Sequence, residues 1–250
     1  MRLITKRLFF ILLNCFSFTL LSAQTLYWVG GAGNFNDQKH WSLNSGGASS
    51  NLIPNSGTDV VFDDLSGHSN VSILFIGKNL AKSFLFLNQS YSLSLLGAES
   101  SYLTISGDFV LNERVLPEFQ TRLNFSSSSI NKSKNFVGFF GRTINSNLNF
   151  IQGVWDLSSV VIPANRTAKF ISGNYYLDNT TINVGNFISD SLKVQFYIKK
   201  GLVRVKNKFV IGQNTSFATS DTYFDVKKYD AQNYQVNSGV SSFEWTKKLS

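Results

Sequence analysis

Few side chains in this sequence could carry acid–base or nucleophilic chemistry. The 250-residue chain contains two histidines, His40 and His68, one cysteine, Cys15, and fifteen acidic residues. A serine nucleophile would need a histidine oriented by a carboxylate and a sharp turn of the form Gly-x-Ser-x-Gly, which does not occur. The sequence also contains neither a glycine-rich phosphate loop nor a paired-histidine zinc motif. It therefore predicts a protein that is not an enzyme and has no metal or organic cofactor.

A late group of carboxylates supports the one enzyme alternative, a polysaccharide lyase or hydrolase built on a β-helix. The group consists of Asp190, Asp221 and Asp225. Carboxylates on one strand face could bind calcium or act as the acid pair of a glycosidase. Alternating exposed strand positions explain these residues without catalysis, so the enzyme stays the third hypothesis for the function.

An early group of carboxylates could supply oxygen ligands for calcium. It consists of Asp37, Asp59, Asp63 and Asp64. Their spacing does not fit the acidic ladder, central glycine and distant glutamate of an EF-hand. Aspartate is also a common cap of tight turns, and this is the preferred interpretation.

The strongest charge feature is a basic segment late in the chain. Arg204, Lys206 and Lys208 alternate with apolar residues or asparagine and would project from one face of a strand. Such a stripe is a candidate binding surface for an acidic polysaccharide, and the alternative is a solvated face that prevents strand-edge aggregation. The net charge of +8 is a mild excess that falls to +5 without the three basic residues of the leader. Outside the cell, a nucleic acid is not an expected partner.

The first residues predict export through a cleavable signal peptide. Three basic residues, Arg2, Lys6 and Arg7, precede an apolar run over residues 8–21, and small residues precede Gln24. This run is short for a transmembrane anchor and is interrupted by polar residues, so no membrane span is expected after cleavage. Asparagine before the single cysteine argues against lipid attachment. We therefore expect a secreted protein or one on the outer cell surface.

The mature chain is patterned for β-strands throughout. Apolar residues alternate with polar ones in short runs separated by Gly, Asn and Ser, which is typical of strands that bury one face. The clearest runs are Tyr91, Leu93 and Leu95; Leu103, Ile105, Phe109 and Leu111; Val194, Phe196 and Ile198; and Val203 and Val205. No window beyond the leader sustains helical spacing. The predicted class is all-β.

A loose repeat of about twenty residues refines this class. Gly77 and Gly97 are twenty residues apart, as are Gly153 and Gly173, and glycine followed by an alternating strand recurs at Gly201. Coils of this length can bury their inner faces only against neighbouring coils. The predicted fold is a right-handed parallel β-helix, or β-solenoid, and a Greek-key β-sandwich is the alternative.

The segment after the leader resembles the opening of a known group of proteins. The motif comprises Tyr-Trp-Val-Gly-Gly at 27–31, Gly-Asn-Phe-Asn-Asp at 33–37, His-Trp-Ser at 40–42, Ile-Pro at 53–54 and Asp-Val-Val-Phe-Asp at 59–63. It is similar to the N-terminal region of large adhesin-like surface proteins of Bacteroidetes, in which β-solenoid repeats follow. The resemblance implies a structural or adhesin-like protein of the cell surface, and a weaker likeness extends to about Val226.

The sequence departs from that pattern in two ways. Phe35 stands where tryptophan is usual, and no segment resembles the C-terminal sorting domain that such proteins often carry. Without a segment like the sorting domain, the resemblance does not imply type IX export or covalent surface attachment for this chain.

The aromatic residues of the motif have two interpretations. Trp28, Phe35 and Trp41 are large apolar side chains that could cover the open first coil as an N-terminal aromatic cap. Alternatively, Trp28 and Trp41 could stack on a sugar, which together with the basic stripe would make a module that binds an extracellular polysaccharide or a host or cell-surface glycan. The predicted organisation is a signal peptide at 1–23, a capping segment at 24–65, solenoid repeats at 66–226 and a polar tail at 227–250.

Overall fold

The computed structural model describes residues 24–67, 69–128, 133–190, 192–212, 214–226, 229–231 and 235–236. The predicted signal peptide and His68 lie outside the described residues. Within them the chain forms strands and two single-turn 3₁₀ helices, η1 (Gln38–His40) and η2 (Asp64–Ser66), and no α-helix. No helix in this part of the chain is long and apolar enough to cross a bilayer.

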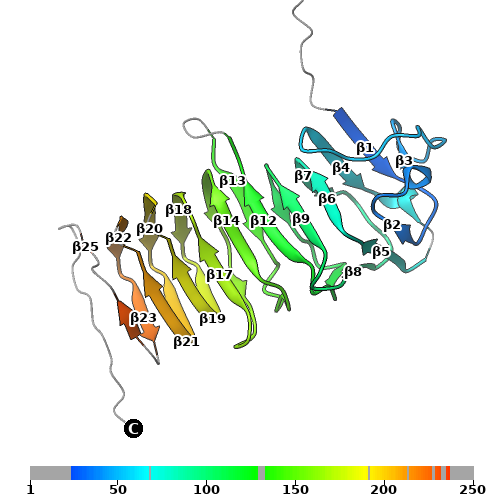
Figure 1. Ribbon diagram of the computed structural model, residues 1–250. Coiled ribbons are helices and arrows are strands. Elements are labelled where there is room, and N and C mark those ends of the chain that lie inside the picture. The colour runs from blue at the N-terminus through cyan, green and yellow to red at the C-terminus, as the bar shows by residue number, and fades with distance from the viewer. Residues whose placement is uncertain are drawn as a thin grey trace, which may run out of the picture.

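The strands form a parallel β-solenoid of about eight turns, drawn as successive coils along one axis in Figure 1. Sheet A has eleven strands in the order β3 (Trp41–Ser42), β1 (Gln24–Trp28), β4 (Thr58–Phe62), β7 (Ser83–Phe86), β10 (Phe109–Val110), β13 (Asn135–Gly138), β15 (Val154–Leu157), β18 (Gly173–Asp178), β20 (Val194–Lys199), β22 (Thr215–Ser220) and β25 (Gln235–Val236).

Two further sheets complete the coils. Sheet B contains β2 (Gly33–Asn34), β5 (Val71–Phe75), β8 (Leu93–Gly97) and β11 (Val115–Pro117). Sheet C contains β6 (Lys78–Ala81), β9 (Tyr102–Ile105), β12 (Arg122–Ser126), β14 (Leu148–Gln152), β17 (Thr167–Phe170), β19 (Thr181–Ser189), β21 (Leu202–Ile211) and β23 (Tyr223–Val226). Off this path, β16 (Val160–Val161) pairs with β19 and β24 (Tyr229–Ala231) with β21.

The pairing confirms the solenoid and shows that the β-sandwich alternative is wrong. Of the pairings between described strands, only β1 with β3 is antiparallel, whereas a sandwich would consist of antiparallel sheets. Val154 pairs with Asn174, twenty residues later, which is the repeat length predicted from the sequence. Pairing also continues past residue 226, since β24 and β25 join the ladders of β21 and β22. The handedness of the winding stays a prediction.

The repeated glycines have different roles. Gly153 and Gly173 both have φ +126 and lie one above the other, as the twenty-residue spacing predicts. Gly77 and Gly97 are not equivalent, because Gly77 occupies a turn with φ +62 whereas Gly97 ends β8 and pairs with Phe75. Their spacing in the sequence is coincidental, since this coil is longer than twenty residues.

Every apolar residue in the alternating runs predicted from the sequence is buried. Aromatic rings in equivalent positions of successive coils stack along the interior. In sheet C, the ring centroids of Phe125 and Phe150 are 4.8 Å apart, and those of Phe150 and Phe170 are 4.9 Å apart. These distances match the spacing of neighbouring strands, so each ring contacts the next and the core is continuous from coil to coil.

Candidate functional site

The two motif tryptophans are core residues of the first coil. Trp28 and Trp41 have no exposed surface, and their rings meet edge to face with centroids 5.0 Å apart. Each indole N–H donates to a backbone carbonyl, from Trp28 to Gly31 at 2.7 Å and from Trp41 to Phe35 at 2.8 Å. Such burial leaves neither ring a face for a sugar, so the glycan-stacking interpretation of Trp28 and Trp41 is wrong.

Phe35 joins the same aromatic cluster. It is fully buried, and its ring centroid lies 5.1 Å from those of Trp41 and Phe75. The cluster therefore links the first coil to sheet B and, through the contact of Trp41 with Phe62, to sheet A. This packing supports the interpretation of Trp28, Phe35 and Trp41 as an end cap.

His40 has a packing role in this motif. Its ring lies flat on Trp28 with centroids 4.6 Å apart, and its Nδ1 is 2.9 Å from the carbonyl oxygen of Val29. A Cβ atom on Gly33 would collide with the imidazole, and Gly30 has φ +84, a conformation that favours glycine. The glycines and the histidine of the motif are thus explained by close packing around Trp28.

The early aspartates are engaged in turns and ion pairs. Asp37 accepts from the backbone N–H of Lys39 at the start of η1, and Asp63 forms a capping box with Ser66 at η2. Asp59 is 2.9 Å from Lys82 Nζ. The remaining member, Asp64, accepts from the backbone N–H of Ser90. Capping, the preferred interpretation, accounts for two of the four, and the described residues contain no group of three or more His, Cys, Asp or Glu arranged to hold a metal.

Two of the three late carboxylates, Asp190 and Asp225, are ion-paired with basic residues. Asp190 lies 3.0 Å from Lys169 Nζ, and Asp225 lies 2.8 Å from Arg204 Nε. Asp221 occupies a turn at φ +48. Asp190 and Asp225 are half-buried, and their ion pairs account for both without a catalytic role.

The basic segment is less regular than the sequence predicts. Arg204, Lys206 and Lys208 are all exposed, but Asn207 between them is exposed as well, so alternation breaks here. The register between β19 and β21 shifts at this point. Arg204 is also ion-paired with Asp225, which neutralises part of the segment. These residues do not form a single uniform row for an acidic polysaccharide.

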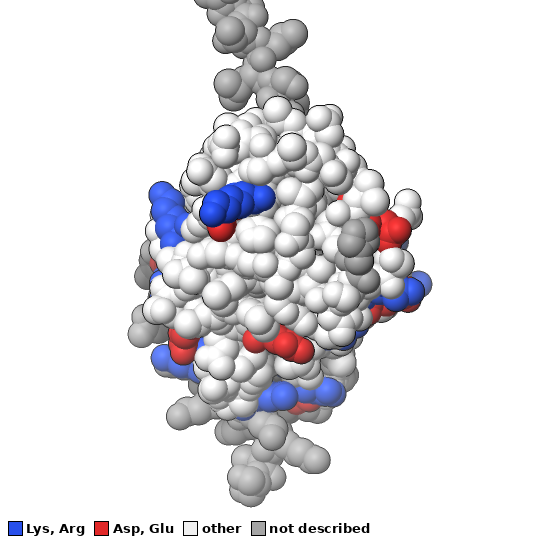
Figure 2. Space-filling model, turned by 90° about the vertical axis from the view of Figure 1, so that its right-hand side faces the viewer, with Lys and Arg blue, Asp and Glu red and all other residues white. Residues whose placement is uncertain are grey.

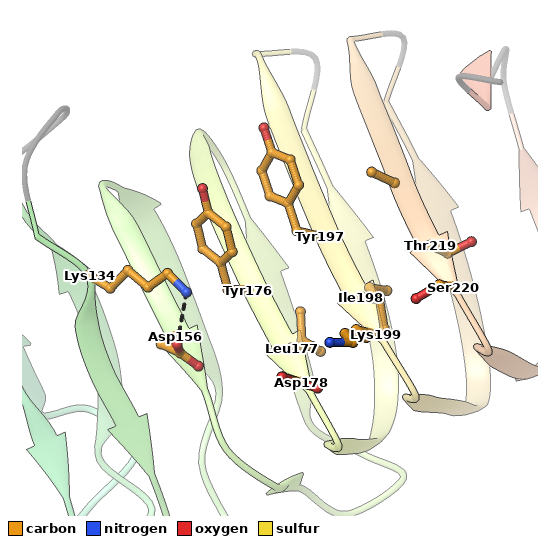
Figure 3. Close-up of a pocket in the computed structure, with 11 residues that line it drawn as sticks. Lys134, Asp156, Tyr176, Leu177, Asp178, Tyr197, Ile198, Lys199, Thr219 and Ser220 are labelled. Carbon is orange, nitrogen blue, oxygen red and sulfur yellow. Dashed lines mark hydrogen bonds and ion pairs between the residues drawn. The ribbon is translucent and has the colours of Figure 1, made fainter. Parts of the chain in front are cut away.

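A groove of about 540 Å³ lies elsewhere, on the outer face of sheet A. Its central feature is a pair of stacked tyrosines, Tyr176 and Tyr197, whose ring centroids are 4.7 Å apart with planes inclined by 10°. Lys134 Nζ lies 3.9 Å from the centroid of Tyr176 and 3.2 Å from Asp156 Oδ2. Figure 3 shows the two rings side by side, projecting in the same direction from neighbouring strands.

The groove follows from the parallel register of β15, β18, β20 and β22. Asp156, Tyr176, Tyr197 and Ala218 occupy one outward-facing column, because each pairs with the next. A second column, two residues further along the strands, contains Asp178, Lys199 and Ser220. Outward columns repeat at every second residue of a strand, so aromatic and polar columns lie beside each other.

These tyrosines do not stand out as a site in the sequence. Tyrosine is a common strand residue, and Tyr175 and Tyr176 are adjacent, so only alternation tells which of them faces outward. One signal in the sequence could have indicated the pair. Tyr176 and Tyr197 are twenty-one residues apart, about one coil, and each follows an aromatic residue that faces inward. Chemically, the groove offers an aromatic stack with hydrogen-bonding groups beside it.

The end of the solenoid formed by the first coil differs from this groove. Figure 2 shows that face with few and scattered charged residues among mostly uncharged ones. No charged cluster gathers there that would mark a binding surface for a polyelectrolyte.

Comparison with known proteins adds no assignment: no family model matches the chain, and no curated protein or solved structure is significantly similar to it.

Proposed function

We propose that this chain is an exported, non-catalytic protein of the bacterial cell surface with a structural or adhesin-like role. The observation that carries the proposal is the unbroken solenoid, in which buried apolar residues run from Leu26 to Phe224 in one continuous core. Such a core produces an elongated scaffold whose outer sheet faces are available to the surroundings.

Two features of the sequence support the location. The basic start and apolar run of residues 1–23 have the form of a cleavable leader. The motif that begins at Tyr27 resembles the opening of adhesin-like surface proteins of Bacteroidetes, and its residues pack into the first coil around Trp28 and Trp41.

The location is tested by expressing the full chain, with its own leader, in a Bacteroidetes host. We expect the mature protein to begin at Gln24 by mass spectrometry and to be labelled on intact cells by an antibody. A variant lacking residues 1–23 is the control and should remain inside. Uncleaved protein that is labelled only after lysis would refute the proposal.

The absence of catalysis is tested separately with the purified mature chain. We expect no new reducing ends and no unsaturated sugar products after incubation with acidic or neutral polysaccharides. Turnover that is lost on changing Asp190, Asp221 or Asp225 to Asn would instead establish the lyase or hydrolase hypothesis.

A further inference from the structure

Within the described residues, the tyrosine column of sheet A leaves the ring position beside Tyr197 unfilled. Tyr176 is covered on one side by Lys134 and on the other by Tyr197. On the far side of Tyr197 the next strand presents Ala218, which is exposed. Tyr197 itself is 36% exposed. Since neighbouring strands are about 4.8 Å apart, a flat ring placed over Ala218 would stack on Tyr197 as Tyr197 stacks on Tyr176.

Polar columns border this position on both sides. Gln195 and Ser216 precede Tyr197 and Ala218 by two residues, and Lys199 and Ser220 follow them by two. Side chains two residues apart on a strand share one face. A ligand ring over Ala218 would therefore have an aromatic surface against its face and hydrogen-bonding groups along its edges.

The charges of the groove nearly cancel. Lys134 is ion-paired with Asp156, and Asp178 is the registered neighbour of Lys199. A surface that holds two bases and two acids provides no net attraction for a polyanion. The electrostatics thus favour an uncharged ligand over an acidic one.

We propose that the groove binds a neutral polysaccharide, with one pyranose ring stacked on Tyr197 over Ala218. A pyranose has an apolar face of C–H groups and a rim of hydroxyls, and these match the aromatic column and the polar columns respectively. The aromatic side chain of a protein partner would use the ring of Tyr197 but would leave the polar columns unpaired. The lining of the groove extends across β15, β18, β20 and β22, so a bound sugar chain can follow these neighbouring strands. This site is independent of the location proposed above.

The test is titration of the mature chain with neutral hexasaccharides of glucose, xylose, mannose and galactose, and with an oligouronate of the same length, followed by calorimetry and saturation-transfer NMR. At least one neutral hexasaccharide should bind, and more tightly than the oligouronate. Tyr197→Ala should weaken binding about tenfold, whereas Tyr197→Phe should retain it, since the ring and not the hydroxyl makes the stack.

The decisive variant is Ala218→Tyr, which fills the empty position with the protein's own ring. We expect it to abolish binding while leaving the circular dichroism spectrum and the thermal midpoint unchanged or improved. Tyr223→Ala removes an exposed tyrosine of β23 in sheet C, away from the groove, and should bind as the unmodified chain does. Unchanged binding by Ala218→Tyr, preference for the oligouronate, or no binding to any neutral hexasaccharide would overturn the proposal.

Discussion

Arg166 is a buried cation whose partners come from earlier coils. Its side chain is 8% exposed, and its Nη1 lies 2.7 Å from Glu99 Oε1. Its Nε donates to Asn145 Oδ1 at 3.0 Å, and its Nη2 is 3.5 Å from Gln120 Oε1. Four coils are thereby connected through one guanidinium, which explains how a charged residue is accommodated at a solenoid corner.

Replacing this cation should destabilise the fold. Arg166→Met retains much of the side-chain volume but removes the donors to Asn145 and Gln120, so we expect a loss of about 1–3 kcal/mol in the free energy of unfolding. Urea denaturation followed by circular dichroism measures it. Arg122→Met changes an exposed arginine of β12 and should cost less than about 0.5 kcal/mol. If the two substitutions lower the free energy of unfolding equally, the buried hydrogen bonds and ion pair of Arg166 do not stabilise the fold.

Tyr175 gives the fold a dependence on alkaline pH. Burial raises the pKa of its hydroxyl above the ordinary value of 10.0, and this hydroxyl donates to the carbonyl of Ser172 at 2.7 Å. In the unfolded chain the hydroxyl ionises near its ordinary pKa, whereas in the folded protein it stays protonated. Because the folded-state pKa is the higher one, the stabilisation by this group is present below pH 10 and declines as the pH rises further.

Tyr175→Phe should therefore reduce the slope of stability against pH in the alkaline range. At neutral pH the variant should lose about 1 kcal/mol with its hydrogen bond. The difference from the unmodified chain should shrink between pH of about 9 and about 11.5, as measured by urea midpoints. Tyr223→Phe, at an exposed position, is the control, and its urea midpoints should change with pH as those of the unmodified chain do. Parallel curves for Tyr175→Phe as well would refute the role assigned to burial.

At the scale of strands, alternation predicted the fold well but could not locate the groove. The pattern Val194, Phe196, Ile198 identified the inward face of β20, because burial of apolar side chains is the dominant constraint on a strand. The outward face is under no such constraint, so Tyr197 differed little from any exposed strand residue until register placed it beside Tyr176.

The irregular basic segment could not be predicted for the same reason, whereas the packing of the first coil could be. A register shift near Val184 is a property of two paired strands and leaves no mark in the sequence of β21 alone. In contrast, the motif around Trp28 is local, so its aromatic and glycine residues could be interpreted as a packing unit before any pairing was known.

Gly173, the first residue of β18, should tolerate no side chain. Gly173 has φ +126, and a Cβ atom there would collide with the carbonyl oxygen of Gly153. Gly173→Ala should therefore cost about 2–4 kcal/mol from backbone strain and displacement of the neighbouring coil. Gly141→Ala is the matched control, because Gly141 also has a positive φ, +69, but open space around its Cβ position. The Gly141→Ala variant should lose only about 1 kcal/mol in the free energy of unfolding. Comparable losses in urea denaturation would contradict the collision.

On the scale of the whole molecule, stability is distributed along the axis. Apart from the bonds of Arg166 to Glu99 and Gln120, coils pack mainly against their direct neighbours, so the loss of an inner residue weakens two interfaces while the loss of an end residue can release one coil. The first coil covers β4, whose backbone pairs with β1 over Gln24 to Tyr27. If β1 detached, the edge of sheet A at β4 would be open to pairing with another molecule.

Tryptophan substitutions at the end and in the middle of the solenoid should consequently have different effects. Trp41→Ala and Trp155→Ala each remove a fully buried indole and should each cost about 3–5 kcal/mol. Trp41→Ala should in addition release the first coil. Amide hydrogens of residues 24–42 should then exchange rapidly. The protein should also associate and elute as larger species in size-exclusion chromatography with light scattering. Trp155→Ala should keep the protection of residues 24–42 and the mass of the unmodified chain. If Trp155→Ala associates as readily, or if Trp41→Ala keeps its N-terminal protection, then the aromatic residues of the first coil do not act as an end cap.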